Sequence, residues 1–112
     1  MSTRTETWAW LAQRASAAVL ALCVAVHLAT MIVAVRGGLN AADILGRTRG
    51  SAVWAAFYGL FVLAVAIHAP LGLRTIASEW LGWRGHGADS ACAVIALALL
   101  ALGGLAVAAV TL

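Results

Sequence analysis

The chain has 112 residues, of which 64% are hydrophobic and 10% are charged, and its formal net charge is +3. A soluble domain of this length cannot bury so much apolar surface, so the composition excludes that class and predicts a protein that uses lipid as its solvent. The seven basic residues are all arginines that stand apart along the chain and flank apolar runs. They do not form the basic patch typical of nucleic-acid binding, so we expect no nucleic-acid partner and interpret them as anchors at the surface of the bilayer.

Three apolar runs are each long enough to cross a bilayer as one α-helix, namely residues 15–35, 51–76 and 90–112. A helix needs ~20 residues to cross a hydrocarbon core of ~30 Å. The sequence therefore predicts a single all-α integral membrane domain, residues 1–112, with three transmembrane helices.

The polar connections predict helix caps and an orientation. Asn40 or Asp43 can cap a short interfacial helix in the first connection, and Asp89 or Ser90 can cap the third span. Four arginines lie on the side of the N-terminus and three on the opposite side: Arg4, Arg14, Arg74 and Arg84 against Arg36, Arg47 and Arg49. Under the positive-inside rule, this predicts a cytoplasmic N-terminus and a C-terminus outside.

Two histidines lie inside the apolar runs, His27 in the first and His68 in the second. Imidazole is costly to place in hydrocarbon, so a histidine within the membrane predicts a functional site. Two of them on neighbouring helices indicate axial ligation of haem, because imidazole is a standard ligand for haem iron. The alternative is a structural histidine that bonds a carbonyl group of a neighbouring helix.

The residues after His68 favour the ligand interpretation. Gly72 lies one helical turn further on the same face, where a missing side chain leaves room for a flat macrocycle. Arg74 follows near the end of the span, where its guanidinium can pair with a haem propionate.

Helical rise predicts different depths for the two histidines. At ~1.5 Å per residue from the same edge of the membrane, His27 lies ~20 Å deep and His68 ~12 Å deep. This mismatch of ~8 Å disfavours two ligands on one iron and favours two haems, each completed by a partner chain.

Polar residues at the ends of the first two spans indicate a second site. Arg14 and Ser16 begin the first span, and Glu79 and Trp80 follow the second. If these spans are antiparallel, guanidinium, hydroxyl, carboxylate and indole N–H groups meet at one interface and can bind a quinone head group. An ordinary polar rim is the alternative.

The stretch from Ile67 to Trp80 resembles the second helix of the membrane anchors of the succinate dehydrogenase and fumarate reductase (complex II) family. In that family, a haem-ligating histidine precedes a glycine by one turn, and an acidic-aromatic pair ends the helix. The stretch from Gln13 to Leu28 resembles the first helix of the family, which begins with a basic residue and a hydroxyl near the quinone. Dihaem members carry a histidine further along that helix.

The resemblance implies a cytochrome b-type anchor, which forms half of a helical anchor bundle and belongs to a succinate:quinone oxidoreductase. Such an anchor ties a flavoprotein subunit and an iron–sulfur subunit to the inner (cytoplasmic) membrane. It mediates electron transfer with quinone through one or two haem b groups shared with a second anchor subunit, and it is not catalytic alone. The alternatives are a haem-free structural helical subunit and a haem b anchor of a different membrane dehydrogenase.

Overall fold

The structure, a computed structural model, describes residues 2–112 and consists of helices joined by short connections. In chain order they are α1 (Thr3–Arg36), α2 (Ala41–Thr48), α3 (Ala52–Leu81) and α4 (His86–Thr111). The helices α1, α3 and α4 are long and apolar enough to cross a membrane, whereas α2 is a short helix of 8 residues. The all-α fold with three spans is therefore confirmed for the described residues.

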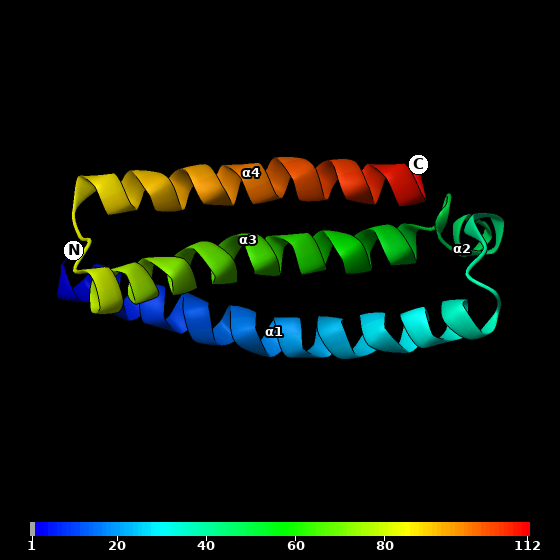
Figure 1. The fold of residues 1–112 in the computed structure, drawn as a ribbon, viewed down its shortest axis with the longest axis horizontal. Helices are drawn as coiled ribbons and strands as arrows, with labels where there is room; N and C mark the ends of the chain where they lie inside the picture. The colour runs from blue at the N-terminus through cyan, green and yellow to red at the C-terminus, as the bar shows by residue number, and fades with distance from the viewer. Residues whose placement is uncertain (1) are drawn as a thin grey trace.

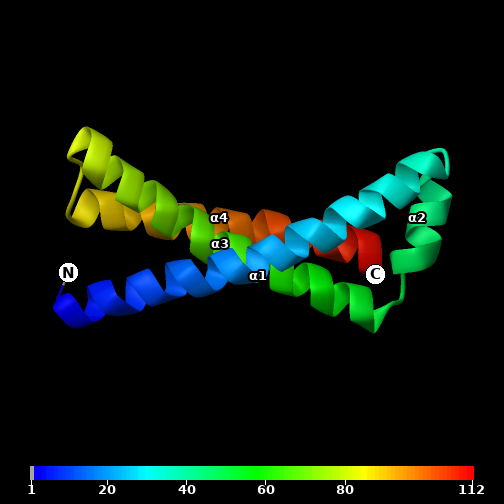
Figure 2. The ribbon, with the colours of Figure 1, turned by 90° about the horizontal axis from the view of Figure 1, so that it is seen from below.

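The helix α3 lies between α1 and α4 and packs against both (Figure 1). One end of the bundle holds the start of α1, the end of α3 and the start of α4, and we call it the N-terminal end. The C-terminal end holds the end of α1, α2, the start of α3 and the C-terminus. Figure 2 shows that α1 crosses α3 at an angle, so that these two helices diverge toward both ends of the bundle.

The long helices extend beyond the apolar runs. The helix α1 begins at Thr3, where the side chain of Ser2 accepts a hydrogen bond from the backbone N–H of Thr5 at 3.3 Å. At ~1.5 Å per residue, the 34 residues of α1 exceed the ~30 Å of a hydrocarbon core. Hydropathy detects only the part of a helix that lipid surrounds, so the polar turns at its start were missed.

Side-chain caps begin α2 and α3. The side chain of Asn40 accepts a hydrogen bond from the backbone N–H of Ala42 at 2.8 Å, which confirms the predicted short helix and one of its two predicted caps. Ser51 accepts from the backbone N–H of Trp54 at 3.2 Å. Hydroxyl and amide oxygens at these positions satisfy N–H groups that have no partner within the helix.

The prediction that Asp89 or Ser90 caps the third span is wrong. The helix α4 begins at His86, directly after Gly85, which has φ 92° and no side chain to act as a cap. Glycine adopts this conformation without the steric cost of a Cβ atom, so the chain can turn and start the helix earlier. Asp89 consequently lies in the first turn of α4.

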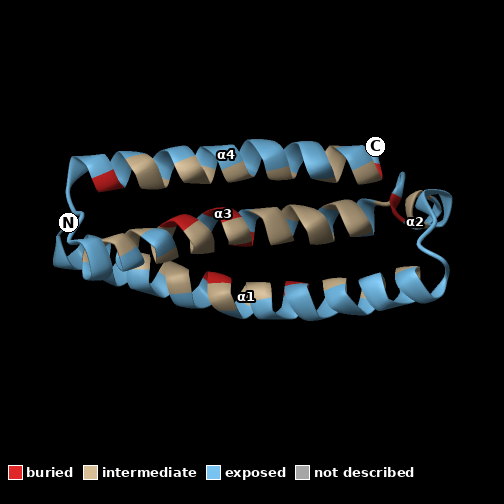
Figure 3. Ribbon diagram, viewed as in Figure 1, coloured by how far each residue is buried: buried red, intermediate tan, exposed pale blue. Residues whose placement is uncertain are grey.

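Small residues set the spacing between α3 and α4. A Cβ atom at Gly103 would lie 2.6 Å from a methyl group of Val62, so only glycine permits this approach of the two helices. Buried residues lie mainly where α1 and α4 face α3, and the outward faces are exposed (Figure 3). Leucines on these outward faces, such as Leu22 and Leu105, are about 70% exposed, as expected for side chains in lipid.

Candidate cofactor site

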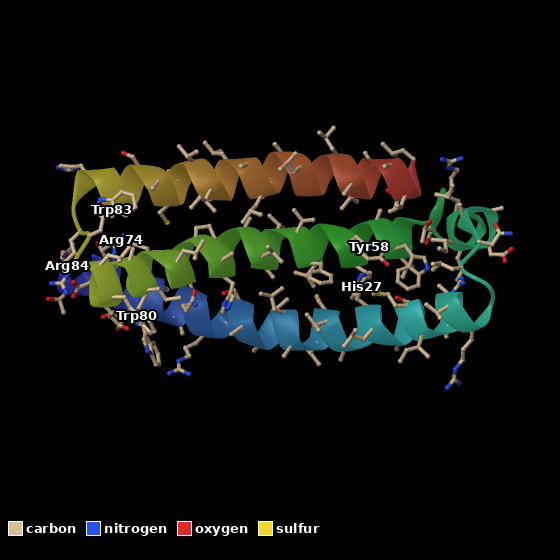
Figure 4. The ribbon with its side chains drawn as sticks, viewed as in Figure 1. His27, Tyr58, Arg74, Trp80, Trp83 and Arg84 are labelled. Atoms are coloured by element: carbon tan, nitrogen blue, oxygen red, sulfur yellow. The ribbon has the colours of Figure 1, made fainter. Side chains whose placement is uncertain are left out.

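His27 lies between α1 and α3 and packs against aromatic rings of α3. Its ring centroid is 5.8 Å from that of Tyr58 and 5.7 Å from that of Phe61, both in edge-to-face geometry. Figure 4 shows the side chains of His27 and Tyr58 directed toward each other in the space between the two helices. Nδ1 of His27 is buried and has no hydrogen-bond partner among the described residues. An unsatisfied buried polar atom costs about 1–3 kcal/mol, so this imidazole is suited to bind a group from outside the chain.

An open-sided apolar cavity of about 490 Å³ adjoins His27. Its walls come from α3 and α4, and Ile44 and Thr48 of α2 line it at the C-terminal end. This volume falls within the ~300–1,000 Å³ typical of ligand and cofactor sites. A second cavity of about 160 Å³ shares His27 and Tyr58 with the first and is also lined by Arg47. The C-terminal half of the bundle thus combines apolar space with an unpaired imidazole nitrogen.

His68 lies in a tighter environment on α3. Its Nδ1 atom is also buried and without a partner in the described part of the chain. One turn further, a Cβ atom at Gly72 would lie 3.2 Å from Nε2 of Gln13 on α1. The space that Gly72 leaves is therefore next to a side-chain amide. Gln13 itself has a buried Oε1 atom with no partner among the residues described.

The two imidazoles lie at different depths. His27 is level with Tyr58 and Phe61 of α3, and His68 follows these residues by ten and seven positions on the same helix. At ~1.5 Å per residue, the two histidines are ~10–15 Å apart along the bundle. This spacing is too large for both side chains to serve as axial ligands of one iron.

Arg74 joins α3 to α4 at the N-terminal end of the bundle. Its Nε atom donates a hydrogen bond to Oδ1 of Asp89 at 2.8 Å, and a terminal guanidinium nitrogen lies 2.6 Å from the same oxygen. The sequence analysis predicted that this guanidinium pairs with a haem propionate, but two of its nitrogens already contact the carboxylate of Asp89. Since an arginine has five N–H donors, the others remain for a second acceptor.

Ser16 and Arg14, two of the four residues expected at a quinone pocket, lie on α1. Ser16 is buried, and its hydroxyl donates a hydrogen bond to the backbone carbonyl of Gln13 at 3.1 Å. The guanidinium of Arg14 is exposed and lies 5.5 Å from the centroid of the Trp10 ring. Ser16 thus belongs to the region of unpaired polar atoms near Gly72, while Arg14 faces outward.

Glu79 and Trp80, the other two, are exposed near the end of α3, and Trp80 is 82% exposed. Gly72 is the residue of α3 beside Gln13, so Glu79 and Trp80 lie seven and eight positions beyond that contact, or ~10–12 Å. Because α1 and α3 diverge toward this end (Figure 2), the structure does not bring the four residues together. Antiparallel packing was inferred correctly, but the crossing of the two helices separates the pairs.

Residues with a place near the candidate site also include Gln13, Arg47 and Tyr58, which the sequence did not assign to it. Arg47 was interpreted as an anchor at the surface of the bilayer, and no periodic pattern relates Arg47 or Tyr58 to His27. Gln13 carried a signal, since it is a polar residue close to the start of an apolar run.

The fold and these positions define a class, the helical membrane proteins that carry unpaired histidines within their membrane-spanning helices. The model of the succinate dehydrogenase/fumarate reductase transmembrane subunit family matches residues 1–107. The chain belongs to this family, and the resemblance drawn from its first two spans is confirmed. No curated protein and no solved structure was found to match the chain.

Proposed function

We propose that the chain is the haem b-binding anchor of a succinate dehydrogenase/fumarate reductase-like complex, and that His68 and His27 each supply an axial ligand to a separate haem. The observation that carries the proposal is the pair of buried, unpartnered Nδ1 atoms inside two membrane-spanning helices. Family membership supports it. When bound, haem supplies one-electron transfer between the dehydrogenase subunits and quinone.

The residues present fit such a group at His27 as they stand, and at His68 with a shift of one side chain. Beside His27, the cavity of about 490 Å³ offers space with mostly apolar walls. Beside His68, Gly72 has no side chain, but Nε2 of Gln13 lies 3.2 Å from the position that a Cβ atom would take, so a haem on this face requires the Gln13 side chain to move. Each level holds one of these imidazoles, so a second protein ligand for either haem would come from another chain, which we propose is a second membrane anchor.

We place the quinone site near the N-terminal end, between α1 and α3. Ser16, whose hydroxyl is buried, lies one turn after Gln13 on α1, and the side chain of Gln13 has an unpaired amide oxygen and lies beside Gly72 of α3. Arg14 faces outward between them in the sequence, so we assign its positive charge to the rim of the pocket. These groups can hold a quinone head group while its tail lies in lipid. Glu79 and Trp80 lie about two turns further out, where we assign them to the entrance of the pocket.

The dehydrogenase subunits, a flavoprotein and an iron–sulfur protein, are proposed to dock on the N-terminal end of the bundle. This end carries four of the seven arginines, which under the positive-inside rule supports our proposal that it faces the cytoplasm and that the C-terminus lies outside the inner membrane. The two termini lie at opposite ends of the bundle (Figure 1), as this topology requires. A reporter fused after Leu112 should be active outside the cytoplasm, and activity only in the cytoplasm would reverse the assignment.

One observation favours a haem-free structural subunit. The edge-to-face contacts of His27 with Tyr58 and Phe61 give this imidazole a packing role that needs no iron. A haem b anchor for a different membrane dehydrogenase would share both histidines, and a subunit inventory of the purified complex separates it from the main proposal.

The test is a pyridine haemochrome assay with reduced-minus-oxidised spectra of the intact complex. We expect protohaem in the wild type, loss of one spectral component in His68→Ala and loss of the other in His27→Ala. His86→Ala is the matched control, because His86 is exposed at the start of α4. A complex without haem, or unchanged spectra in both membrane variants, would favour the structural subunit.

A further inference from the structure

The short helix α2 is fixed to the end of α4. Oγ1 of Thr48 donates a hydrogen bond to the backbone carbonyl of Val110 at 2.6 Å, although these residues are 62 positions apart. The backbone N–H of Gly50 donates to the carbonyl of Thr111 at 2.8 Å. The last carbonyl groups of a helix have no partner within it, so α2 and the turn after it supply the partners that α4 lacks. The position of α2 across the C-terminal end is thereby set by two long-range bonds.

This attachment places Arg47, the neighbour of Thr48, at the mouth of the site around His27. Arg47 and His27 line the same cavity of about 160 Å³, and this cavity shares His27 and Thr48 with the larger apolar one. Within residues 2–112, the ion pair that is found joins Arg74 to Asp89, so Arg47 has no carboxylate partner. The only acidic residue of the first connection is Asp43, against the basic residues Arg36, Arg47 and Arg49. A positive charge without a partner thus stands at the edge of a cavity that contains an imidazole nitrogen without a partner.

We propose that α2 acts as a fixed cover for the cofactor site at His27 and that Arg47 binds a carboxylate of that cofactor, a haem propionate. This inference rests on the proposed function and extends it to a residue that the sequence assigned to the membrane surface. The guanidinium group matches a carboxylate in charge and in hydrogen-bond geometry. The site offers an apolar cavity, an imidazole without a partner and a guanidinium without a partner. A haem matches these with its flat apolar ring, its iron and its propionates.

An anionic phospholipid is the competing occupant, with its phosphate on Arg47 and an acyl chain in the apolar cavity. An acyl chain offers no partner to the imidazole of His27, whereas haem iron does. The unpaired nitrogen therefore favours haem, and the lipid becomes an outcome of the test.

The experiment compares Arg47→Gln with Arg49→Gln in the intact complex. Arg49 is exposed, directly follows α2 and does not line either cavity, so it controls for loss of a surface charge. The midpoint potentials of the haems are measured by redox titration of their reduced absorption bands. A nearby cation stabilises the reduced haem, so Arg47→Gln should shift one midpoint potential to lower values and leave the other unchanged. The shifted component should be the one that disappears in His27→Ala.

A second variant tests the attachment of α2. Thr48→Val keeps the shape of the side chain but removes the hydrogen bond to Val110, and it should shift the same haem in the same direction by a smaller amount. Lipid extraction and mass spectrometry accompany the titration. Equal midpoint potentials in Arg47→Gln and Arg49→Gln, a shift confined to the His68 haem, or loss of a bound phospholipid without any shift would overturn the inference. A wild-type complex without haem would contradict the proposed function, and the inference would fail with it. That result is obtained before any arginine variant is compared.

Discussion

The surroundings of His27 and His68 differ although both are histidines within apolar, membrane-spanning helices. His27 stands among aromatic rings beside a cavity of about 490 Å³, with α2 at its end. His68 lies one turn before Gly72, where α1 and α3 approach closely enough that a Cβ atom at Gly72 would lie 3.2 Å from Gln13. One histidine adjoins a cavity, while the other adjoins a glycine whose missing side chain faces a neighbouring helix. Two histidines that look equivalent in the sequence therefore need different tests of cofactor binding.

The largest expected effect on the haem spectrum comes from filling the cavity beside His27. Ala106 lines the large cavity, so Ala106→Phe places a ring in the space that we assign to the His27 haem. We expect loss of that haem component and retention of the His68 component in reduced-minus-oxidised spectra. Ala101→Phe, at an exposed position of α4 outside the cavities, is the control. Loss of the His68 component instead would show that the cavity serves the other histidine.

The close packing of α1 against α3 at Gln13 and Gly72, which we call the tight region, should be disrupted by a side chain at Gly72. Its Cβ atom would lie 3.2 Å from Gln13, so Gly72→Leu forces α1 and α3 apart and should destabilise the subunit by about 1–3 kcal/mol. The His68 component should be altered and the His27 component retained. Gly104→Leu introduces the same group where nothing lies within 4 Å and should leave both unchanged. Thermal unfolding of the purified complex and its haem spectrum provide the measurements, and equal behaviour of the two variants would contradict the tight packing.

Quinone chemistry should depend on the tight region more than on the exposed end of α3. Ser16→Ala removes a buried hydroxyl and should lower quinone reduction about tenfold, the scale of a lost hydrogen bond of ~1.4 kcal/mol, with little effect on a soluble dye acceptor. Trp80→Phe should act in the same direction but more weakly, because Trp80 is 82% exposed. Equal loss of both activities would indicate a folding or docking defect, and no loss would place the pocket on the partner anchor.

The smallest effect is expected for the ion pair between Arg74 and Asp89. Its side chains are 22% and 46% exposed, so solvent screens their attraction and the pair should contribute only ~0.2–1 kcal/mol. A double-mutant cycle with Arg74→Gln and Asp89→Asn measures this coupling as a change in unfolding free energy. A larger coupling would mean that a partner subunit buries the pair. A selective change of the His68 haem in Arg74→Gln would support its second role toward a propionate.

Hydropathy predicted the three spans from the sequence, and the positions of the two histidines within these spans predicted that they lie at different depths. The same reasoning missed the first turns of α1 and the start of α4, because polar turns outside lipid carry no apolar signal. It also could not predict that α1 crosses α3, which separates Ser16 from Trp80, since crossing depends on how side chains of both helices interdigitate. The contacts of Tyr58 with His27 and of Thr48 with Val110 are long-range, and no local pattern in a single sequence encodes them.

A cryo-electron microscopy map of the intact complex tests the central claim most directly, because it locates cofactors without relying on activity. We predict two planar haem densities, one in contact with His68 and one with His27, ~10–15 Å apart along the bundle as the helical rise between the histidines requires. A single density that contacts both histidines, or two imidazoles that contact only protein, would contradict the account.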